Sequence, residues 1–392
     1  MSQAALLHHP PSRPTGRLAG RTAPRVVLLQ TQAEAAGAQE ISRLLAAGLA
    51  ARGCDVDQLF LFRRTDAFDG DPHAIFCAAD RPRTPRQLLV MFARLHRELR
   101  RLRPDVVILF QHYGNLIGGV FARAAGVPVV IANQNGLMDI LSPAVIGLDR
   151  LFGRLGIFSR IVVNSSTTEA EYRNHPRAYR RRLVRIDHGF GEKRSRLGRA
   201  EARDAFGFGR DDVILGCVAR LHPNKQLDAA IRLLPGNPGW RLALAGQGSA
   251  RDSLERLAAD LGCADRVSFA GELAPERVAD FLAALDVFVF PTVSETFGLA
   301  AVEAAQAGIP VVANALPVLA DILSHEGRPA ALFADARDTA AFGAAVRRIL
   351  DEPTLAGALT SRGARLRDRF PLDAMVDAYE ALVRERHPVP TP

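Results

Sequence analysis

Short apolar runs alternate along this chain with longer segments in which apolar residues recur every three or four positions. The runs are rich in Val, Ile and Leu, which is typical of strands that are buried on both faces of a parallel sheet. In the first half this pattern predicts strands at 25–30, 56–62, 104–110, 127–132 and 161–164, and helices at 37–52, 84–103 and 118–125. These elements indicate a doubly wound α/β domain.

The alternation begins again after a polar, arginine-rich segment at residues 180–203. Further strands are expected at 212–219, 240–245, 267–269, 287–290 and 311–312, with helices between them. The sequence therefore predicts an α/β protein of two Rossmann-like domains, 24–190 and 191–370, that face a central cleft holding the main site. Residues 1–23, rich in Pro, Arg and His, are expected to form a disordered leader. The last segment, 371–392, contains a helix that could cross back to the N-terminal domain.

Composition narrows the classes of protein that fit. The chain has 392 residues, of which 48% are hydrophobic and 23% charged, and no apolar run reaches the ~18 residues of a membrane-spanning helix. We therefore expect a cytoplasmic protein. Its cysteines, 54, 77, 217 and 263, are scattered, which favours reduced thiols over a zinc site.

Charge is distributed unequally between the two halves. Residues 1–190 hold 26 Arg and no Lys against 15 acids, whereas residues 191–392 hold 24 Arg and Lys against 27 acids. Coding bias would explain why 48 Arg stand beside only two Lys, but not why the first half is basic. The asymmetry predicts that the N-terminal half faces something anionic.

The segment 291–303 carries the most specific chemical signal. Glu295 and Glu303 lie eight positions apart, with Phe297, Gly298 and Leu299 between them. The first carboxylate is expected on a loop at the carboxyl end of a strand, and the second one to two turns into the next helix. The helix N-terminus between them favours an anion. Two carboxylates that can bind hydroxyls, placed around such a turn, suit a nucleotide-activated sugar.

Two cations follow the first strand of the second half. Arg220 and Lys225 lie in a loop where a guanidinium fork and an ammonium could hold a diphosphate; an ordinary solvated loop is the alternative. Gly246 and Gly248 follow the next strand, and Gly37 follows the first strand of the chain. Each glycine could let a ligand approach the backbone, or could simply serve a βα turn.

In the N-terminal half, polar residues end two of the expected strands. His112 could hydrogen-bond a sugar or shuttle a proton, or could be a structural loop histidine. Asn133 and Asn135 could recognise acceptor hydroxyls, or could form a polar turn. Asp69 and Asp71 are spaced like a metal–nucleotide motif, but they lie in a Pro/Asp/Gly loop that we interpret as a turn. We expect no metal site.

The helix expected at 84–103 is basic and amphipathic. One stripe holds apolar residues, and the arginines lie mostly off it; the stripe comprises Leu88, Phe92, Leu95, Leu99 and Leu102. Such a helix either covers a sheet with a solvated arginine face or docks on anionic lipid headgroups.

Taken together, these motifs resemble the large retaining glycosyltransferase family of GT-B fold, family 4. The resemblance covers about residues 25–385 and is strongest at 213–312. Arg220 and Lys225 match the family's Arg…Lys pair, and Glu295 and Glu303 match its Glu-x7-Glu motif. The chain departs from the family pattern at the domain junction, with Asp187-His-Gly for the frequent Pro-Asn-Gly, and at Gln226, where a glycine is common.

The resemblance implies a hexose transfer from a UDP- or GDP-sugar to an acceptor hydroxyl, without a metal or other cofactor. It implies that Arg220 and Lys225 neutralise the leaving diphosphate, that Glu295 binds the donor sugar, and that Glu303 binds the ribose. Gly37 and His112 would lie near the sugar. An envelope, exopolysaccharide or lipid-linked acceptor is expected from the basic half, with peripheral attachment to an anionic membrane. An epimerase of the same fold, an inactive nucleotide-sugar-binding protein and, more weakly, nucleic-acid binding are the alternatives.

Overall fold

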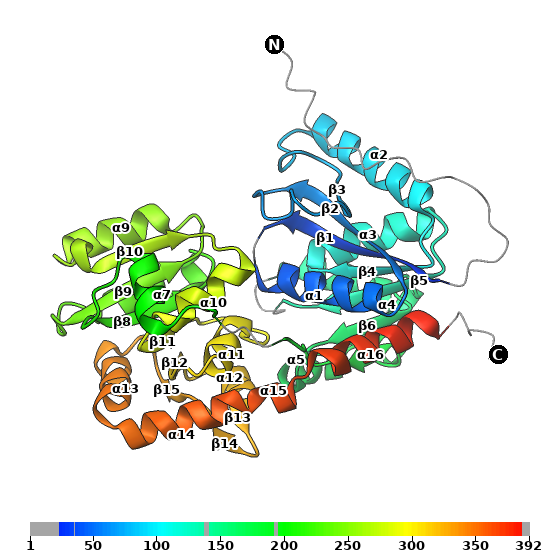
Figure 1. The fold of residues 1–392 in the computed structure, drawn as a ribbon. Helices are drawn as coiled ribbons and strands as arrows, with labels where there is room; N and C mark the ends of the chain where they lie inside the picture. The colour runs from blue at the N-terminus through cyan, green and yellow to red at the C-terminus, as the bar shows by residue number, and fades with distance from the viewer. Residues whose placement is uncertain (1–22, 35, 137–140, 192–194, 386–392) are drawn as a thin grey trace, which may run out of the picture. The chain divides into compact units, whose positions relative to one another are not determined.

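The computed structural model describes residues 23–34, 36–136, 141–191 and 195–385. The described chain forms two compact units, shown in Figure 1. Unit 1 comprises the chain up to Gly189 and again from Leu372, and unit 2 is Phe190–Pro371. Residues 1–22 of the expected leader lie outside the described residues, and so do residues 386–392 of the expected last segment.

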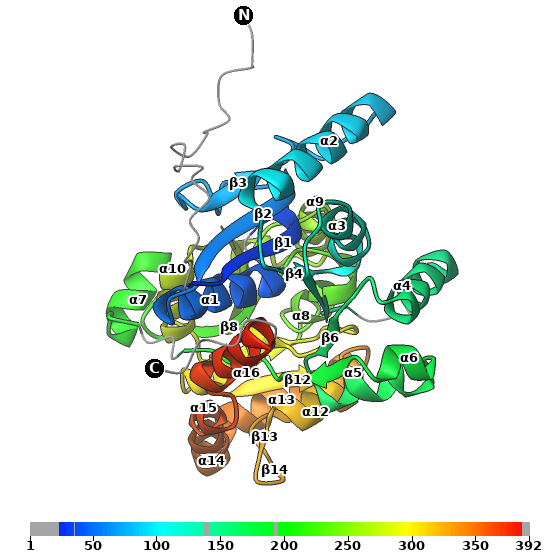
Figure 2. The ribbon, with the colours of Figure 1, turned by 90° about the vertical axis from the view of Figure 1, so that its right-hand side faces the viewer.

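Unit 1 is built around a parallel sheet. In the described residues its strand order is β3-β2-β1-β4-β5-β6-β7, and helices cover both faces (Figures 1 and 2). The elements are β1 (Arg25–Ala33), α1 (Gly37–Ala51), β2 (Asp55–Arg63), β3 (Ala74–Phe76), α2 (Pro85–Leu102), β4 (Val106–Phe110), α3 (His112–Ala124), β5 (Val129–Gln134), α4 (Pro143–Leu155), β6 (Arg160–Val163), α5 (Ser166–Glu171), α6 (Arg177–Arg180), β7 (Leu183–Arg185) and α16 (Leu372–Arg384).

Unit 2 repeats the architecture with a second parallel sheet. Over its described part the strand order is β10-β9-β8-β11-β12-β15. The elements are α7 (Arg199–Phe206), β8 (Val213–Val218), the 3-10 turn η2 (Pro223–Lys225), α8 (Leu227–Ile231), β9 (Trp240–Ala245), α9 (Arg251–Asp260), β10 (Val267–Gly271), α10 (Pro275–Ala283), β11 (Val287–Phe290), α11 (Leu299–Gln306), β12 (Val311–Asn314), α12 (Pro317–Ile322), the hairpin β13 (Ser324–His325) and β14 (Arg328–Pro329), β15 (Leu332–Ala334), α13 (Thr339–Asp351), α14 (Pro353–Ala364) and α15 (Leu366–Arg369).

The two parallel sheets confirm the α/β fold class, but several elements differ from the sequence prediction. The short strands β3, β7 and β15 and the helix α4 were not expected. Helix α3 begins at His112 rather than near 118. Glycines within α3 lower its helix propensity, yet Gly118 lets the helix pack directly on Leu29 and Leu109 of the sheet. Tertiary packing therefore extends a helix that the local sequence disfavours.

Helix α2 covers the sheet with only part of its predicted stripe. Leu95, Leu99 and Leu102 are buried in the core of unit 1, and Phe92 packs against that core from a half-buried position. Leu88 is 40% exposed. The sheet-covering alternative is therefore correct for the later turns of α2, but not for its first turns.

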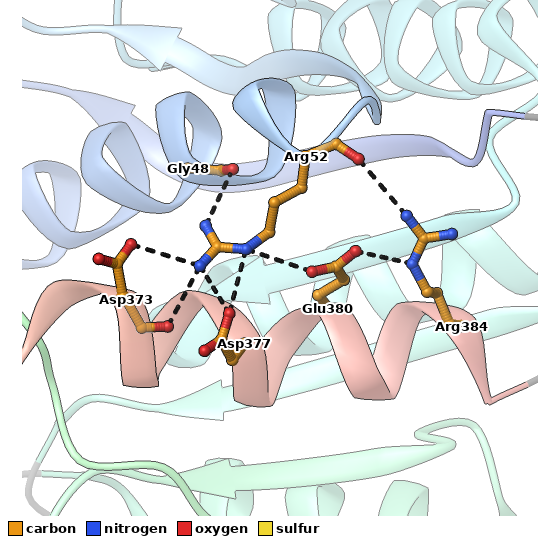
Figure 3. A network of polar contacts seen from close by, with 6 residues as sticks. All are labelled: Gly48, Arg52, Asp373, Asp377, Glu380 and Arg384. Carbon is orange, nitrogen blue, oxygen red and sulfur yellow. Dashed lines mark hydrogen bonds and ion pairs between the residues drawn. The ribbon is translucent and has the colours of Figure 1, made fainter.

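The C-terminal helix α16 packs on α1 within unit 1, as Figure 3 shows. Arg52, at the end of α1, donates to Asp377 of α16 at 2.6 Å and forms an ion pair with Glu380 at 3.2 Å. Gly48 allows the two helices to approach, because a Cβ there would lie 2.5 Å from Val376. Tyr379 adds a buried hydrogen bond to Asn133.

Two histidines are buried inside unit 1. His188 Nε2 lies 2.9 Å from the Asn164 side-chain amide, and the His175 ring packs against Tyr172 and Tyr179 at 4.7 and 4.6 Å between centroids. Burial lowers the pKa of His188 to about 4, and burial followed by the charge of Arg150 lowers the pKa of His175 to about 4.

These lowered pKa values predict a unit that loses stability in acid. Between pH 6.5 and 4 the unfolded chain binds protons that the folded chain excludes, so the free energy of unfolding falls as the pH falls through this window. For His188 alone the loss from pH 7 to pH 5 is about 2 kcal/mol. Urea unfolding followed by circular dichroism should show this loss in the native protein and a smaller one in His188→Gln. Equal pH dependence in the two proteins would contradict it.

The single tryptophan supplies an internal control for that measurement. Trp240 lies in unit 2, so its fluorescence follows the unit that does not contain His188. The substitution should leave the pH dependence of this fluorescence transition unchanged.

Candidate active site

The candidate residues of unit 2 gather at the carboxyl ends of adjacent strands. The loop with Arg220 and Lys225 follows β8, the loop with Gly246 and Gly248 follows β9, and the carboxylate segment follows β11. These strands are neighbours in the order β9-β8-β11. Ligands of open α/β sheets bind at this edge, so the topology brings together residues that are up to 83 positions apart in the chain.

Lys225 and Glu295 meet directly. The Lys225 ammonium donates to the Glu295 carboxylate in an ion pair between the two loops. Their side chains are only 15% and 13% exposed, and the ammonium also lies 5.8 Å from the centroid of the Phe290 ring. Partial burial strengthens such a pair relative to one in bulk water. The lysine of one sequence motif and the first carboxylate of the other therefore form one ion pair.

Main-chain contacts hold the loops of this ion pair together. The carbonyl of Asn224 accepts from the Val293 N–H at 3.0 Å and from the Thr292 hydroxyl at 3.2 Å. The Asn314 side chain, at the end of β12, donates to the Thr292 carbonyl at 2.9 Å. Thr292 and Asn314 are both buried. These supporting residues were missed by the sequence analysis, although an asparagine ending a buried strand was a usable signal for Asn314.

The residue after Lys225 explains one departure from the family pattern. Gln226 has a left-handed backbone, with φ of 46°. This conformation costs roughly 1–2 kcal/mol for a residue with a Cβ and little for glycine. A glycine would therefore suit this position, and Gln226 adopts the left-handed backbone at some cost in stability.

The turn before α11 is shaped by buried residues. Gly298 caps the helix with φ of 86°, and a Cβ there would lie 2.5 Å from the Leu319 side chain. Phe297 is buried against Phe190 and Phe370, at 5.9 and 5.1 Å between ring centroids. Phe297 is therefore a packing residue that fixes the turn. The first backbone N–H groups of α11 belong to the next residues, beginning with Leu299.

Glu303 lies on the second turn of α11 and is 6% exposed. Burial of a carboxylate is costly unless other groups compensate its charge. The two carboxylates of the motif therefore differ in setting, since Glu295 is paired with a cation on another loop and Glu303 is enclosed on the helix.

Gly246 and Gly248 support the loop that carries Arg220. A Cβ on Gly246 would collide with the Ala219 carbonyl, and one on Gly248 would collide with the Leu221 carbonyl. Between these glycines, the Gln247 carbonyl accepts from the Leu221 N–H at 2.9 Å. The two glycines thus allow the backbone of their own loop to lie directly against the backbone of the Arg220 loop.

Unit 1 gathers its candidates at the carboxyl edge of its own sheet. Gly37 is exposed at the start of α1, after β1, and His112 opens α3, after β4. Asn135 follows β5 and is half-buried. Strands β1, β4 and β5 are neighbours. Burial is the largest effect on His112 and lowers its pKa, whereas a hydrogen bond to the Gly136 backbone raises the pKa by less. The lowered pKa favours a neutral imidazole near pH 7.

Asn133 has a structural position. Its side chain is fully buried, donates to the Leu109 carbonyl at 3.0 Å, and accepts from the Tyr379 hydroxyl of α16. Both ends of its amide are therefore used inside unit 1. The suggested contact of Asn133 with an acceptor gains no support from this arrangement.

Asp69 and Asp71 form a turn, as the sequence predicted. Asp69 pairs with Arg63, and Asp71 accepts from the His73 N–H at 2.8 Å and from Gln58 at 2.7 Å. A short strand that the sequence did not predict, β3, begins soon after this turn at Ala74. Within the described parts of the chain, no group of three or more His, Cys, Asp or Glu could hold a metal ion.

Two family descriptions match the chain. Glycosyltransferase Family 4 matches residues 35–193, and Glycosyl transferases group 1 matches residues 198–366. Among curated relatives, D-inositol 3-phosphate glycosyltransferase of Streptomyces avermitilis is 30% identical over 71% of this chain and 66% of its own length. The lipopolysaccharide core mannosyltransferase LpsB of Rhizobium meliloti is 31% identical over 51% of this chain and 61% of its own length. With two further D-inositol 3-phosphate glycosyltransferases included, the alignments span about half to two thirds of the relatives' own lengths.

Solved structures share the fold. Sucrose-phosphate synthase from Thermosynechococcus elongatus superposes with a TM-score of 0.78 at 22% identity, over 92% of this chain and 98% of that one. Anabaena HepE, solved with UDP and glucose, gives 0.77 at 16% identity, over 92% of this chain and all of the other. Together with the family matches in both halves, these likenesses show that the chain belongs to the GT-B glycosyltransferases of family 4.

Proposed function

We propose that the protein is a retaining glycosyltransferase that moves a hexose from a UDP- or GDP-sugar to an acceptor hydroxyl. The observation that carries this proposal is the ion pair between Lys225 and Glu295, which joins loops after two neighbouring strands of unit 2. The pair places an ammonium group, which could bind a phosphate, beside a carboxylate, which could accept hydrogen bonds from sugar hydroxyls. Arg220 lies in the same loop as Lys225 and supplies a second cation.

The donor would bind along the carboxyl edge of the unit 2 sheet. Arg220 and Lys225 would neutralise its diphosphate, and the N–H groups that begin α11 would support the distal phosphate or the sugar. A diphosphate attracts the Lys225 ammonium, which frees Glu295 oxygens to accept from sugar hydroxyls. Glu303 would accept from the ribose hydroxyls. Gly246 and Gly248 would act indirectly, through the backbone of the Arg220 loop.

The transfer itself needs charge stabilisation more than a strong base. The bond between the anomeric carbon and the diphosphate oxygen breaks, and the acceptor oxygen bonds to that carbon on the same face. The acceptor proton passes to the leaving phosphate oxygen. Negative charge develops on the diphosphate, where fixed cations and N–H groups lower the barrier. His112, whose lowered pKa favours a neutral imidazole near pH 7, would hydrogen-bond the donor sugar, and Gly37 would lie near that sugar.

On the acceptor side we propose a saccharide or lipid-linked acceptor of the cell envelope, an exopolysaccharide or a glycolipid. The relatives named for inositol phosphate and for a lipopolysaccharide core support a polyhydroxylated acceptor. The arginine excess of residues 1–190 favours one that carries negative charge. Asn135, half-buried at the edge of unit 1, is the remaining amide candidate for its hydroxyls.

The proposed reaction is tested by following UDP-glucose, UDP-galactose and GDP-mannose by proton NMR, with inositol phosphates or core saccharides as acceptors. We expect an α-linked product from one of these α-linked donors. A β-linked product would contradict retention. Conversion of the donor sugar to its epimer without acceptor would instead indicate an epimerase.

Removal of divalent metals should leave the rate unchanged. Because Arg220 and Lys225 would supply the positive charge that a metal supplies in other sugar-transfer enzymes, excess EDTA should alter the initial rate by less than about twofold, against the several kcal/mol that a catalytic metal contributes. The control is the same assay with added magnesium. Loss of most activity in EDTA, restored by magnesium, would refute metal independence.

A further inference from the structure

The first two turns of α2 stand free of unit 1. Residues 85–90 are all exposed, whereas burial begins at Met91. A helix that covers a sheet normally exposes one face and buries the other, so six exposed residues in succession indicate a helix that extends past its support. Figure 2 shows one end of α2 extending beyond the strands of unit 1. The exposure identifies that end as the N-terminal one.

This free end carries three consecutive apolar side chains. Leu88, Leu89 and Val90 are 40%, 68% and 60% exposed. A tight capping box holds the helix here, because Thr84 accepts from the Gln87 N–H while the Gln87 side chain accepts from the Thr84 N–H. The apolar residues are therefore held on a formed helix. We call residues 81–90 the α2 tip.

The α2 tip itself carries positive charge. Arg81, Arg83 and Arg86 are all exposed, and residues 81–103 contain eight Arg and a single acid. That acid, Glu98, is buried and pairs with Arg101 at 2.6 Å. Apolar side chains within a basic, acid-poor helix fit the interface of an anionic bilayer, where leucines enter the acyl boundary and arginines contact headgroups.

The fold places the α2 tip toward the edge of the unit 1 sheet that carries the candidate site residues. Helix α2 connects β3 to β4, and neighbouring strands from β3 to β5 pair in parallel. Its first turns therefore lie toward the carboxyl ends of the unit 1 strands, the same edge as His112 and Asn135. We propose that the α2 tip docks the protein on anionic membranes by inserting Leu88, Leu89 and Val90. Docking would then present a lipid-linked acceptor to this edge. This further step rests on the proposed function.

Vesicle sedimentation tests the docking without any sugar transfer. The full-length protein should bind phosphatidylcholine vesicles that contain 30% phosphatidylglycerol, and should bind pure phosphatidylcholine at least about tenfold more weakly. Replacing Leu88, Leu89 and Val90 together by serine should lower the partition coefficient at least about tenfold. Replacing Arg81, Arg83 and Arg86 by glutamine should cause a similar loss, and 0.5 M salt should do the same.

Two matched controls separate binding through the α2 tip from non-specific apolar adsorption and from the effect of overall charge. Leu148, Leu151 and Leu155 of α4 are 45%, 43% and 67% exposed, so their triple serine variant removes a similar exposed apolar surface. Arg173, Arg177 and Arg181 are also exposed, and their triple glutamine variant removes the same charge. Both controls should bind vesicles within about twofold of the native protein, because membrane charge acts only within a Debye length of the surface.

Several results would overturn the proposal. They are absence of vesicle binding by the native protein, equal binding to neutral and anionic vesicles, and native-like binding by the serine variant of the α2 tip. An equal loss in either control would also overturn it. Binding of RNA that depends on Arg81, Arg83 and Arg86, without vesicle binding, would point to a nucleic-acid surface. Because no donor is present, failure here leaves the proposed sugar transfer untouched.

Discussion

The variant Lys225→Ala is expected to lower the turnover of sugar transfer by a factor of about 10²–10³, since this is the effect of removing one preorganised group from a developing charge. Lys225 is aimed at the proposed diphosphate by the loop contacts of Asn224 and by its ion pair with Glu295. Initial rates with the donor identified by NMR measure the effect. Arg232→Ala removes an exposed cation of the same unit and should retain nearly full activity.

The partner carboxylate separates the catalytic effect from the effect on stability. In Lys225→Ala, Glu295 remains largely buried without its cation, which should cost about 1–3 kcal/mol in the free energy of unfolding. The double variant Lys225→Ala/Glu295→Gln should recover much of that stability but none of the turnover. Recovery of turnover by the double variant, or near-native turnover in Lys225→Ala, would refute the role given to Lys225.

The second large effect is expected from Gly246→Ala. At φ of 137° alanine is strained, and its Cβ would collide with the Ala219 carbonyl, so the variant should lose roughly 2–4 kcal/mol of unfolding free energy through strain and overpacking. The same collision should displace the Arg220 backbone and weaken donor binding. Urea unfolding followed by Trp240 fluorescence, together with donor titration, measures both effects.

Gly262→Ala provides the matched control for this clash. Gly262 has a φ of 64°, and a Cβ there would meet nothing within 4 Å. This control should show only the left-handed backbone cost of about 1–2 kcal/mol, with donor affinity unchanged. If Gly246→Ala were no more destabilising than Gly262→Ala, or bound donor as the native protein does, the Gly246 backbone would not position the Arg220 loop.

Local pattern carried much of the fold and the core of the site. Short apolar runs at 240–245 and 287–290 predicted strands at their observed bounds, because such runs are typical of strands buried in a parallel sheet. The motif residues were found because each follows such a strand. The shortest elements were missed: β3 and β15 are three residues long, too short for any periodicity.

Contacts between distant segments could not be predicted from the pattern. The support of Lys225 by Asn224, Thr292 and Asn314 depends on which strands are neighbours, and the sequence does not state the strand order. The buried hydrogen bond of Asn133 could not be predicted for the same reason, since its partner Tyr379 lies 246 positions away. The predicted stripe of α2 likewise could not reveal where the supporting sheet ends.

The central claim is that the Lys225 loop and the Glu295 segment form a diphosphate site. Isothermal titration with UDP, GDP and their nucleosides tests it most directly in the native protein and in Lys225→Ala. We expect one diphosphate to bind at least about 100-fold more tightly than its nucleoside, in the range of a charge-assisted contact to buried cations, and most of that difference to vanish in Lys225→Ala. Equal affinity for nucleoside and diphosphate, or unchanged diphosphate affinity in the folded variant, would contradict it.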